Sequence, residues 1–282
     1  MQTNANGKKQ GGRVWHLTVT TLVLIFLLLP LLVTILFSIS TVWENSILPK
    51  GITFKWYIEL LSDERFLMAL GRSFLVALIT VTLTLLITVP TIFLISLYFP
   101  RLDKVLKIIV MLPFALPGVV AAVGLIKLYS SPPVALSGTI WILIGVYFVI
   151  ILPFVYTSTR NSLRSVNAPE LMEAAEILGS SKANAFLRVI LPNIMPGVIV
   201  ASLLSFSIIF GEFVLANMLV GGSYEVVQVY LFRILGTDGH ASSATIVTFF
   251  ALVSVLFALV LKIGDRNSRT MLPSDGEEEG SA

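Results

Sequence analysis

The sequence predicts an all-α membrane protein with six transmembrane helices, a helical cytoplasmic loop between helices 4 and 5, and both termini in the cytoplasm. Of its 282 residues, 56% are hydrophobic and only 12% are charged, whereas a soluble domain is about 45–50% apolar and about 25% charged. Six stretches are apolar over the roughly 20 residues that cross a bilayer. Lys and Arg also gather on alternate connecting segments, as the positive-inside rule requires.

The six apolar stretches cover residues 17–40, 66–99, 108–129, 139–159, 196–220 and 244–261. The second is longer than a bilayer needs, so we expect it to tilt, to kink near Pro90 or to begin outside the bilayer. Pro113 and Pro117 predict a kink in the third. The first follows three basic residues but exceeds the 7–15 apolar residues of a cleaved signal. We expect a retained signal-anchor helix, with a cleaved signal as the alternative.

The distribution of basic residues predicts the orientation. With the N-terminus inside, thirteen of the nineteen Lys and Arg residues lie on cytoplasmic segments. The other six lie on the opposite side: Lys50, Lys55, Arg65, Arg72, Lys127 and Arg233. The outer segment 41–65 also contains Trp43, Trp56 and Tyr57, which suit the membrane interface.

The composition also excludes several kinds of site. No cysteine is present, which removes disulfides, thiolate metal ligands and cysteine nucleophiles, and the two histidines, His16 and His240, are far apart. A metal site in this chain is therefore not expected. The chain contains no Gly-x-Ser-x-Gly or His-Glu-x-x-His motif, which argues against an intramembrane enzyme.

The cytoplasmic loop, residues 160–195, is the most structured connecting segment by pattern. Pro169 suits a first helical turn, and Glu170 and Glu173 complement the positive end of the helix dipole. Gly179 fits the left-handed position that ends a helix, after which Ser180 or Ser181 can cap a second short helix. Leu171, Ala174, Ala175 and Leu178 fall on one shallow apolar stripe. This stripe either docks another protein or lies on the chain's own membrane domain or on lipid.

The same loop resembles the EAA loop of permease subunits of binding-protein-dependent ABC importers. The pattern is Glu-Ala-Ala, three residues, Gly, nine residues, Ile, one residue and Leu-Pro. It is matched at Glu173, Ala174, Ala175, Gly179, Leu191 and Pro192, with Val189 in place of the usual Ile. The segment from Met111 to Gly118 is similar to the third-helix region of these permeases.

The resemblance implies a type I importer. The EAA loop, with Glu173, Ala174, Ala175, Leu178, Gly179, Val189, Leu191 and Pro192, would then couple the chain to a separate ATPase. It implies a bacterial cytoplasmic (inner) membrane complex of two ATPases, a second permease subunit (a paralogue is favoured) and an extracytoplasmic solute-binding protein. This chain has no Gly-x-x-x-x-Gly-Lys-[Ser/Thr] phosphate loop. We therefore expect no cofactor on this chain and no catalysis by it, with ATP and Mg on the partner ATPase.

The resemblance also divides the chain. Residues 1–14 form a cytoplasmic tail, residues 15–65 the first transmembrane helix and outer loop, and residues 66–263 the permease domain. Residues 264–282 form a cytoplasmic acidic tail.

Three residues are candidates for the substrate pathway. Glu212 falls well inside the fifth apolar stretch, where an ionised carboxylate costs at least about 2.5–3.5 kcal/mol and should face a cavity, the bundle or a partner. It either stabilises a cationic solute or has a structural role, such as bonding backbone groups near Gly211. Ser205 and Asn217 are the other two candidates.

The stretch around the EAA loop, with Gly211-Glu212-Phe213 after it, resembles permeases of the polyamine group, so a polyamine is the expected substrate. Relatives in this group for 2-aminoethylphosphonate, ferric iron or thiamine are alternatives. A secondary transporter is the alternative from another class, although it would leave the EAA spacing unexplained and would need more intramembrane ionisable residues or inverted repeats.

Overall fold

The computed structural model describes the backbone of residues 5–43 and 48–269 and the side chains of residues 15–43 and 48–262. The chain divides into a smaller unit, Met1–Glu64 with Leu231–Ala251, and a larger unit, Arg65–Tyr230 with Leu252–Ala282. The predicted tails, residues 1–14 and 264–282, lie outside the residues whose side chains are described.

The smaller unit contains α1 (Ala5–Ser38), β1 (Ser40–Val42), β2 (Lys50–Ile52) and α2 (Lys55–Ser62), and the start of α12 (Gly239–Arg269). The two strands are antiparallel, with Ser40 opposite Ile52. Most apolar side chains of α1 between Trp15 and Leu36 are exposed, as expected for a helix that faces lipid. α1 contains the first candidate span, Trp15–Ser38.

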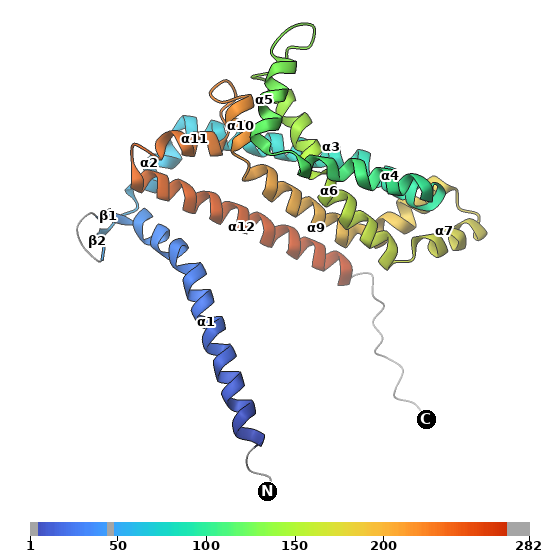
Figure 1. Cartoon of the computed structure of the whole chain (residues 1–282), viewed down its shortest axis with the longest axis horizontal. Helices are drawn as coiled ribbons and strands as arrows, with labels where there is room; N and C mark the ends of the chain where they lie inside the picture. The colour runs from blue at the N-terminus through green and yellow to red at the C-terminus, as the bar shows by residue number, and fades with distance from the viewer. Residues whose placement is uncertain (1–4, 44–47, 270–282) are drawn as a thin grey trace. The chain divides into compact units, whose positions relative to one another are not determined.

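In its described part, the larger unit contains helices joined by loops and no strand (Figure 1). Its elements are α3 (Glu64–Tyr98, whose first residue belongs to the smaller unit), α4 (Pro100–Met111), the 3₁₀ turn η1 (Leu112–Ala115), α5 (Gly118–Tyr129), α6 (Ile140–Ser165), α7 (Ala168–Ile177), α8 (Lys182–Ala185), the π-helical turn η2 (Phe186–Ile190), α9 (Leu191–Phe210), α10 (Val214–Leu219) and α11 (Val227–Ile234). α11 ends, and α12 begins, within the smaller unit.

The described residues contain five helices long and apolar enough to cross a membrane, or six if one bent pair counts as a span. That pair is Pro100–Ala115 with Gly118–Tyr129, which meet at an angle of 97°. The predicted all-α membrane fold is therefore confirmed, with six candidate spans if the bent pair is one of them. The kink predicted in the third span is confirmed, because the chain bends at Pro113 and Pro117, where proline removes backbone donors and ends helices.

The fifth predicted span is wrong at its C-terminal end. The helix runs over Lys182–Phe210, and the chain then leaves the helical path before α10 begins at Val214. Glu212 therefore lies in a break between two helices and not within a continuous span. The side-chain bonds of Glu212, described below, give the physical reason.

α6 packs closely along α9. The contact is tight at Gly197, where an added methyl group would overlap the side chain of Ser162, and Ser158 Oγ donates a hydrogen bond to the Gly197 carbonyl oxygen at 2.8 Å. Small residues let helix backbones approach one another in membranes. Ala201 and Ser205 are fully buried on α9.

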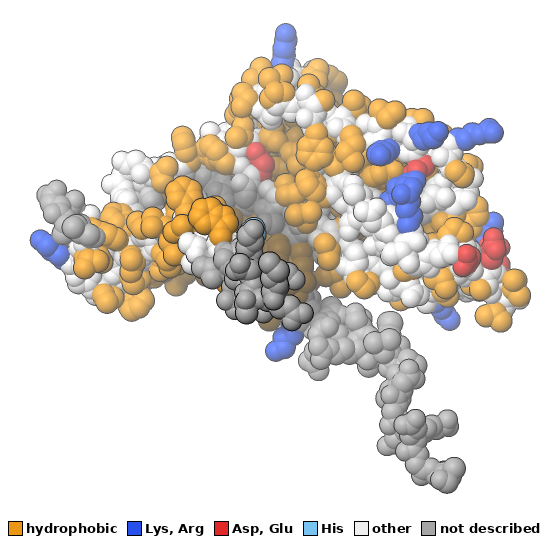
Figure 2. Space-filling view, turned by 60° about the horizontal axis from the view of Figure 1, so that its bottom comes forward, with side chains coloured by type: hydrophobic (Ala, Val, Ile, Leu, Met, Phe, Trp, Pro, Cys, Tyr) orange, Lys and Arg blue, Asp and Glu red, His pale blue; other side chains and the backbone are white. Residues whose placement is uncertain are grey.

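Figure 2 shows that apolar side chains cover much of the visible surface of the larger unit, while many of its charged side chains gather towards the end where α4 and α7 lie. This pattern fits helices that present apolar surface to lipid and keep charge at their ends. The candidate site lies at this charged end.

Candidate functional site

The loop helix α7 begins immediately after α6 because the backbone turns sharply at Asn167. Asn167 has φ 50° and ψ 55°, a left-handed conformation that Asn adopts more readily than most residues. Pro169 occupies the start of the helix, where its missing N–H costs little. Glu170 lies in the first turn, where a carboxylate interacts favourably with the helix dipole. The predicted helix start is confirmed.

The end of α7 is fixed by Gly179. This residue has φ +84°, which strains any residue with a Cβ. The Gly179 N–H donates to the Glu176 carbonyl oxygen at 2.9 Å, and the Ser180 N–H donates to the Ala175 carbonyl oxygen at 3.0 Å. Together these bonds form a Schellman motif, which satisfies two carbonyl groups at the helix end. The predicted glycine stop is confirmed.

The second half of the loop is capped by Ser181, whose Oγ accepts the Asn184 N–H at 3.4 Å. We expected a separate short helix here, and that expectation is wrong. α8, η2 and α9 follow one another without a break and make one candidate span. The motif residues Val189, Leu191 and Pro192 are half-buried in this stretch. They belong to the N-terminal part of the fifth span.

One face of α7 packs on the chain's own helices. Ala168, Met172 and Ala175 are buried, and their spacing places them on one side of an α-helix. They join a buried cluster with α6 (Val155, Tyr156, Leu163), α8 and η2 (Ala185, Ile190), α9 (Ile194, Val198, Ala201), α3 (Val89, Ile92, Phe93) and α4 (Val110). This packing fixes the rotation of α7 about its own axis.

The opposite face of α7 is accessible. Glu170, Glu173, Ala174 and Glu176 are exposed, and the turn that follows presents Ile177 and Leu178, which are 86% and 88% exposed. Two such large apolar side chains beside three carboxylates are unusual on a water-facing loop and typical of a protein interaction site. The described surface of the loop is therefore apolar at its tip and acidic along its side.

The predicted apolar stripe does not lie on a single face. Ala175 is buried, Leu171 is half-buried, and Ala174 and Leu178 are exposed. Met172, which the stripe omitted, takes the central buried position. The two interpretations of the stripe thus each describe one side of α7, because one side packs on the protein and the other stays accessible.

A charged cluster that the sequence did not reveal ties α4 to α6 at the same end. Asp103 is 9% exposed. Its carboxylate accepts hydrogen bonds from Arg160 Nε at 2.7 Å and from Tyr156 Oη at 2.8 Å. A second nitrogen of the Arg160 guanidinium contacts the other carboxylate oxygen, which makes the ion pair bidentate. Such bidentate pairs are stronger and more directional than single bonds. The only sequence feature that pointed to this cluster was the position of Asp103 among the basic residues Arg101, Lys104 and Lys107.

Two aromatic contacts hold the loop to the end of α3. Lys182 Nζ lies 4.5 Å from the centre of the Tyr98 ring, a cation–π geometry. The rings of Phe93 and Phe186 have centroids 4.5 Å apart. The part of the loop that contains Lys182 and Phe186 therefore contacts α3, and through the buried cluster it also contacts α6.

The Glu212 carboxylate bonds backbone groups at the start of α10. Its Oε1 accepts the Leu215 N–H at 2.8 Å, and its Oε2 accepts the Ala216 N–H at 3.1 Å and the Tyr147 hydroxyl at 3.0 Å. These amides are free donors of a helix's first turn, so the carboxylate caps α10 and links it to α6. Glu212 also lines a small cavity with Ser73, Tyr147 and Gln228.

The structure does not bring the three pathway candidates to one site. Ser205 is fully buried, and its hydroxyl has no hydrogen-bond partner among the described residues. Asn217 is half-buried on α10. Neither lines the small cavity beside Glu212. Their role in a pathway remains a prediction.

Comparison with solved structures defines the class of fold. The chain is similar to a subunit of a bacterial ABC transporter involved in the import of alginate, with a TM-score of 0.71, 19% identity, and coverage of 93% of this chain and 99% of that chain. It also resembles a subunit of the MetNI methionine ABC transporter, with a TM-score of 0.53, 17% identity, and coverage of 75% and 100%. At these identities the likeness establishes the fold alone.

The chain belongs to the family described as binding-protein-dependent transport system inner membrane component, whose model matches residues 89–269. It is 27% identical over 244 residues to PhnV of Salmonella typhimurium, a permease protein assigned to 2-aminoethylphosphonate transport, covering 86% of this chain and 90% of PhnV. It is 26% identical over 252 residues to the spermidine/putrescine permease protein PotC of Escherichia coli K12, covering 87% and 92%. The predicted function as a permease subunit of an ABC importer is confirmed.

The Asp103–Arg160 pair gives a testable consequence. Replacing Arg160 with Gln leaves a partly buried carboxylate without its ion pair, and we expect a loss of about 1–3 kcal/mol in unfolding free energy. The exchanged pair D103R/R160D should recover part of this loss. The measurement is the thermal unfolding midpoint of the purified chain in detergent. R164Q, an exposed change one turn further along α6, should stay within about 0.5 kcal/mol. Equal midpoints for R160Q and R164Q would contradict the assignment.

Proposed function

We propose that this chain forms half of an alternating-access pathway and couples it to a separate ATPase through the loop 160–195. The observation that carries the proposal is the division of α7 into a packed face and an accessible face. Ala168, Met172 and Ala175 anchor the helix, so a push on Ile177 and Leu178 would reach α6 and α9 as a rigid displacement. Packed helices transmit such displacements because interiors are dense and poorly compressible.

The orientation supports a cytoplasmic position for this loop. The loop and the N-terminus lie on the same side by the count of spans, and that side carries thirteen of the nineteen basic residues. A loop on this side can reach a cytoplasmic ATPase. The proposed membrane is the bacterial cytoplasmic (inner) membrane, which the description of the family as an inner membrane component supports.

The proposed complex contains two permease subunits, two ATPase subunits and an extracytoplasmic solute-binding protein. One structure similar to this chain is that of the alginate ABC transporter with an alginate-bound periplasmic protein, which supports a binding-protein partner. No phosphate-loop motif occurs in this sequence, so ATP and Mg would bind the partner ATPase. This chain would then bind no cofactor and carry out no catalysis.

The coupling role predicts the effect of a charge at the loop tip. L178D changes a side chain that is 88% exposed, so the fold should persist while an apolar contact with the ATPase is lost. We expect the affinity of the ATPase subunit for the tagged permease to fall at least about tenfold, about 1.4 kcal/mol. Co-purification at graded ATPase concentrations measures this change.

The matched control is N161D, which adds the same charge at an exposed position at the end of α6. It should leave the affinity unchanged. Undiminished ATPase binding by a folded L178D variant would contradict the proposed contact.

A polyamine is the proposed substrate. The relatives PotC and PhnV are named for spermidine/putrescine and 2-aminoethylphosphonate, and both groups of compounds carry an amine. The Glu212 carboxylate can suit a cation, but three donors already occupy it. 2-Aminoethylphosphonate, ferric iron and thiamine remain the alternatives, and a heterodimer of paralogous permeases is the proposed assembly.

Two substitutions separate a capping role of Glu212 from a charge contact with the substrate. E212Q keeps one oxygen, which can accept one of the two amides that the Glu212 carboxylate oxygens bind, whereas E212A removes the cap at a cost of about 1 kcal/mol. If Glu212 acts as a cap, spermidine uptake by reconstituted importer should fall less than about threefold in E212Q and clearly further in E212A. If E212Q loses uptake as completely as E212A while unfolding at the wild-type temperature, a charge contact with the solute would replace the capping account.

A further inference from the structure

The short helix α2 presents three different faces, and one of them is apolar and accessible. Phe54 is the residue directly before α2, and at about 100° per residue the side chains of Ile58 and Leu61 lie about 60° apart on one side of the helix. The side chains of Phe54, Ile58 and Leu61 are 64%, 66% and 54% exposed. Ile52 on β2 adds another exposed apolar side chain beside the start of the helix.

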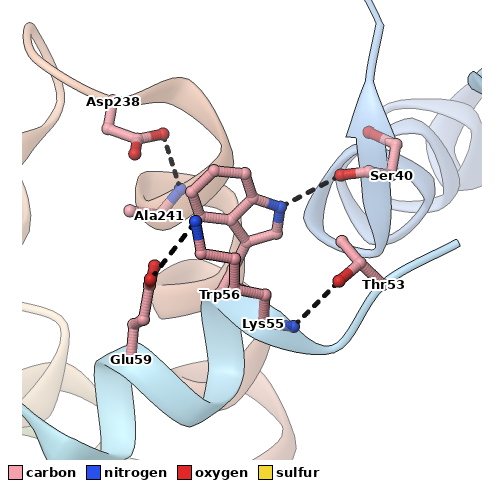
Figure 3. Close-up of polar contacts among 7 residues, drawn as sticks. All are labelled: Ser40, Thr53, Lys55, Trp56, Glu59, Asp238 and Ala241. Atoms are coloured by element: carbon pink, nitrogen blue, oxygen red, sulfur yellow. Dashed lines mark hydrogen bonds and ion pairs between the residues drawn. The ribbon is translucent and has the colours of Figure 1, made fainter.

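The inner face of α2 is held by specific contacts within the smaller unit, some of them drawn in Figure 3. Trp56 Nε1 donates to the Ser40 carbonyl oxygen at 3.0 Å, and the Trp56 ring stacks on His240 with centroids 5.1 Å apart. The Tyr57 and Ser38 hydroxyls are 2.6 Å apart, and Leu60 is 4% exposed. These contacts fix the rotation of α2, so the exposed stripe is not free to turn inward.

The third face is polar. Lys55 and Glu59 form an i,i+4 ion pair at 3.4 Å with most of each side chain exposed, and Ser62 is exposed on the same side. Figure 3 shows Lys55 and Glu59 bonded along the side of α2, with the Lys55 amide also donating to Thr53 Oγ1 at its start. The polar arc therefore adjoins the apolar arc on the accessible part of the helix.

The position of α2 in the chain indicates what covers the apolar stripe. The candidate span in α1 ends at Ser38, and the next begins at Glu64. The segment between them must return to the bilayer surface on one side, whichever side that is. An amphipathic helix at such a place lies in the interface, with its apolar side chains at the boundary between headgroups and acyl chains. Trp and Tyr on the same helix are typical interface residues.

We infer that α2 is an interfacial membrane anchor. Phe54, Ile58 and Leu61 enter the lipid, and Lys55, Glu59 and Ser62 face water. Through the contacts of Trp56 and Tyr57 with Ser40, His240 and Ser38, the helix ties the end of α1 and the start of α12 to the bilayer surface. A solute-binding protein seated on the stripe is the competing occupant, and the test below distinguishes the two.

Because the sequence contains no cysteine, each single-cysteine variant carries one nitroxide label on this chain. The single-cysteine variants I58C and L61C report on the apolar face, and E59C and S62C report on the polar face. All four positions are exposed. L27C, on an exposed part of α1, is the reference for lipid. The full chain is reconstituted in vesicles of phosphatidylethanolamine and phosphatidylglycerol. Power saturation then measures collisions with oxygen, which partitions into lipid, and with a water-soluble nickel chelate.

We expect the oxygen-to-nickel collision ratio at positions 58 and 61 to be several-fold higher than the ratio at positions 59 and 62. The ratio at positions 58 and 61 should not exceed the ratio at the lipid-facing reference position 27. A uniformly low ratio at all four α2 positions would overturn the inference, since the stripe would then face water. Shielding of positions 58 and 61 from both reagents, in the chain alone or after a solute-binding protein is added, would also overturn it, because a protein surface would then cover the stripe.

Discussion

The close packing of α6 against α9 is the contact on which the candidate site depends. The loop 160–195 leaves α6 and returns into α9, so the separation of these two helices fixes both of its ends. Gly197 lies against Ser162, and Ser158 bonds the Gly197 carbonyl oxygen. Because the helices meet this closely, the connecting residues cannot lie between them and project from their end as α7 and the turn at Gly179.

The same end of the larger unit contains the charged and aromatic contacts that hold neighbouring helices to the loop. Asp103 and Arg160 join α4 to α6, and Tyr98 with Lys182 joins α3 to α8. α4 continues through the 97° bend into α5, which packs against α10, the helix that Glu212 caps. A continuous series of contacts therefore leads from the loop to the capped break after α9. Coupling between distant sites requires physical contacts of this kind and two arrangements of them.

The sequence predicted the parts of this arrangement that depend on local chemistry. In the structure, Pro169 lies in the first turn of α7, Gly179 ends that helix and Ser181 caps α8, each through its own backbone or side-chain groups. The long apolar helices were predictable for the same reason, since a bilayer requires about 20 apolar residues. The prolines at 113 and 117 indicated the bend in the third span.

What the sequence did not predict depends on residues far apart in the chain. Asp103 and Arg160 are separated by 57 positions, and no periodic pattern links them. The buried face of α7 is set by the helices it packs on, so Met172 and not Leu178 faces inward. The break at Glu212 was hidden because an uninterrupted apolar stretch looks like one helix. The helix α2 is short, and its faces are defined by Trp56 and Leu60 packing within the smaller unit.

The central claim is that α7 has one face for its own helices and one for an ATPase, and two adjacent alanines test it most directly. Ala174 is exposed and Ala175 is buried. In the assembled importer, a photoactivatable cross-linker attached to the single cysteine of A174C should join this chain to the ATPase subunit, while the same reagent on A175C should not. Cross-linking through position 175, or none through position 174 in an intact complex, would contradict the account.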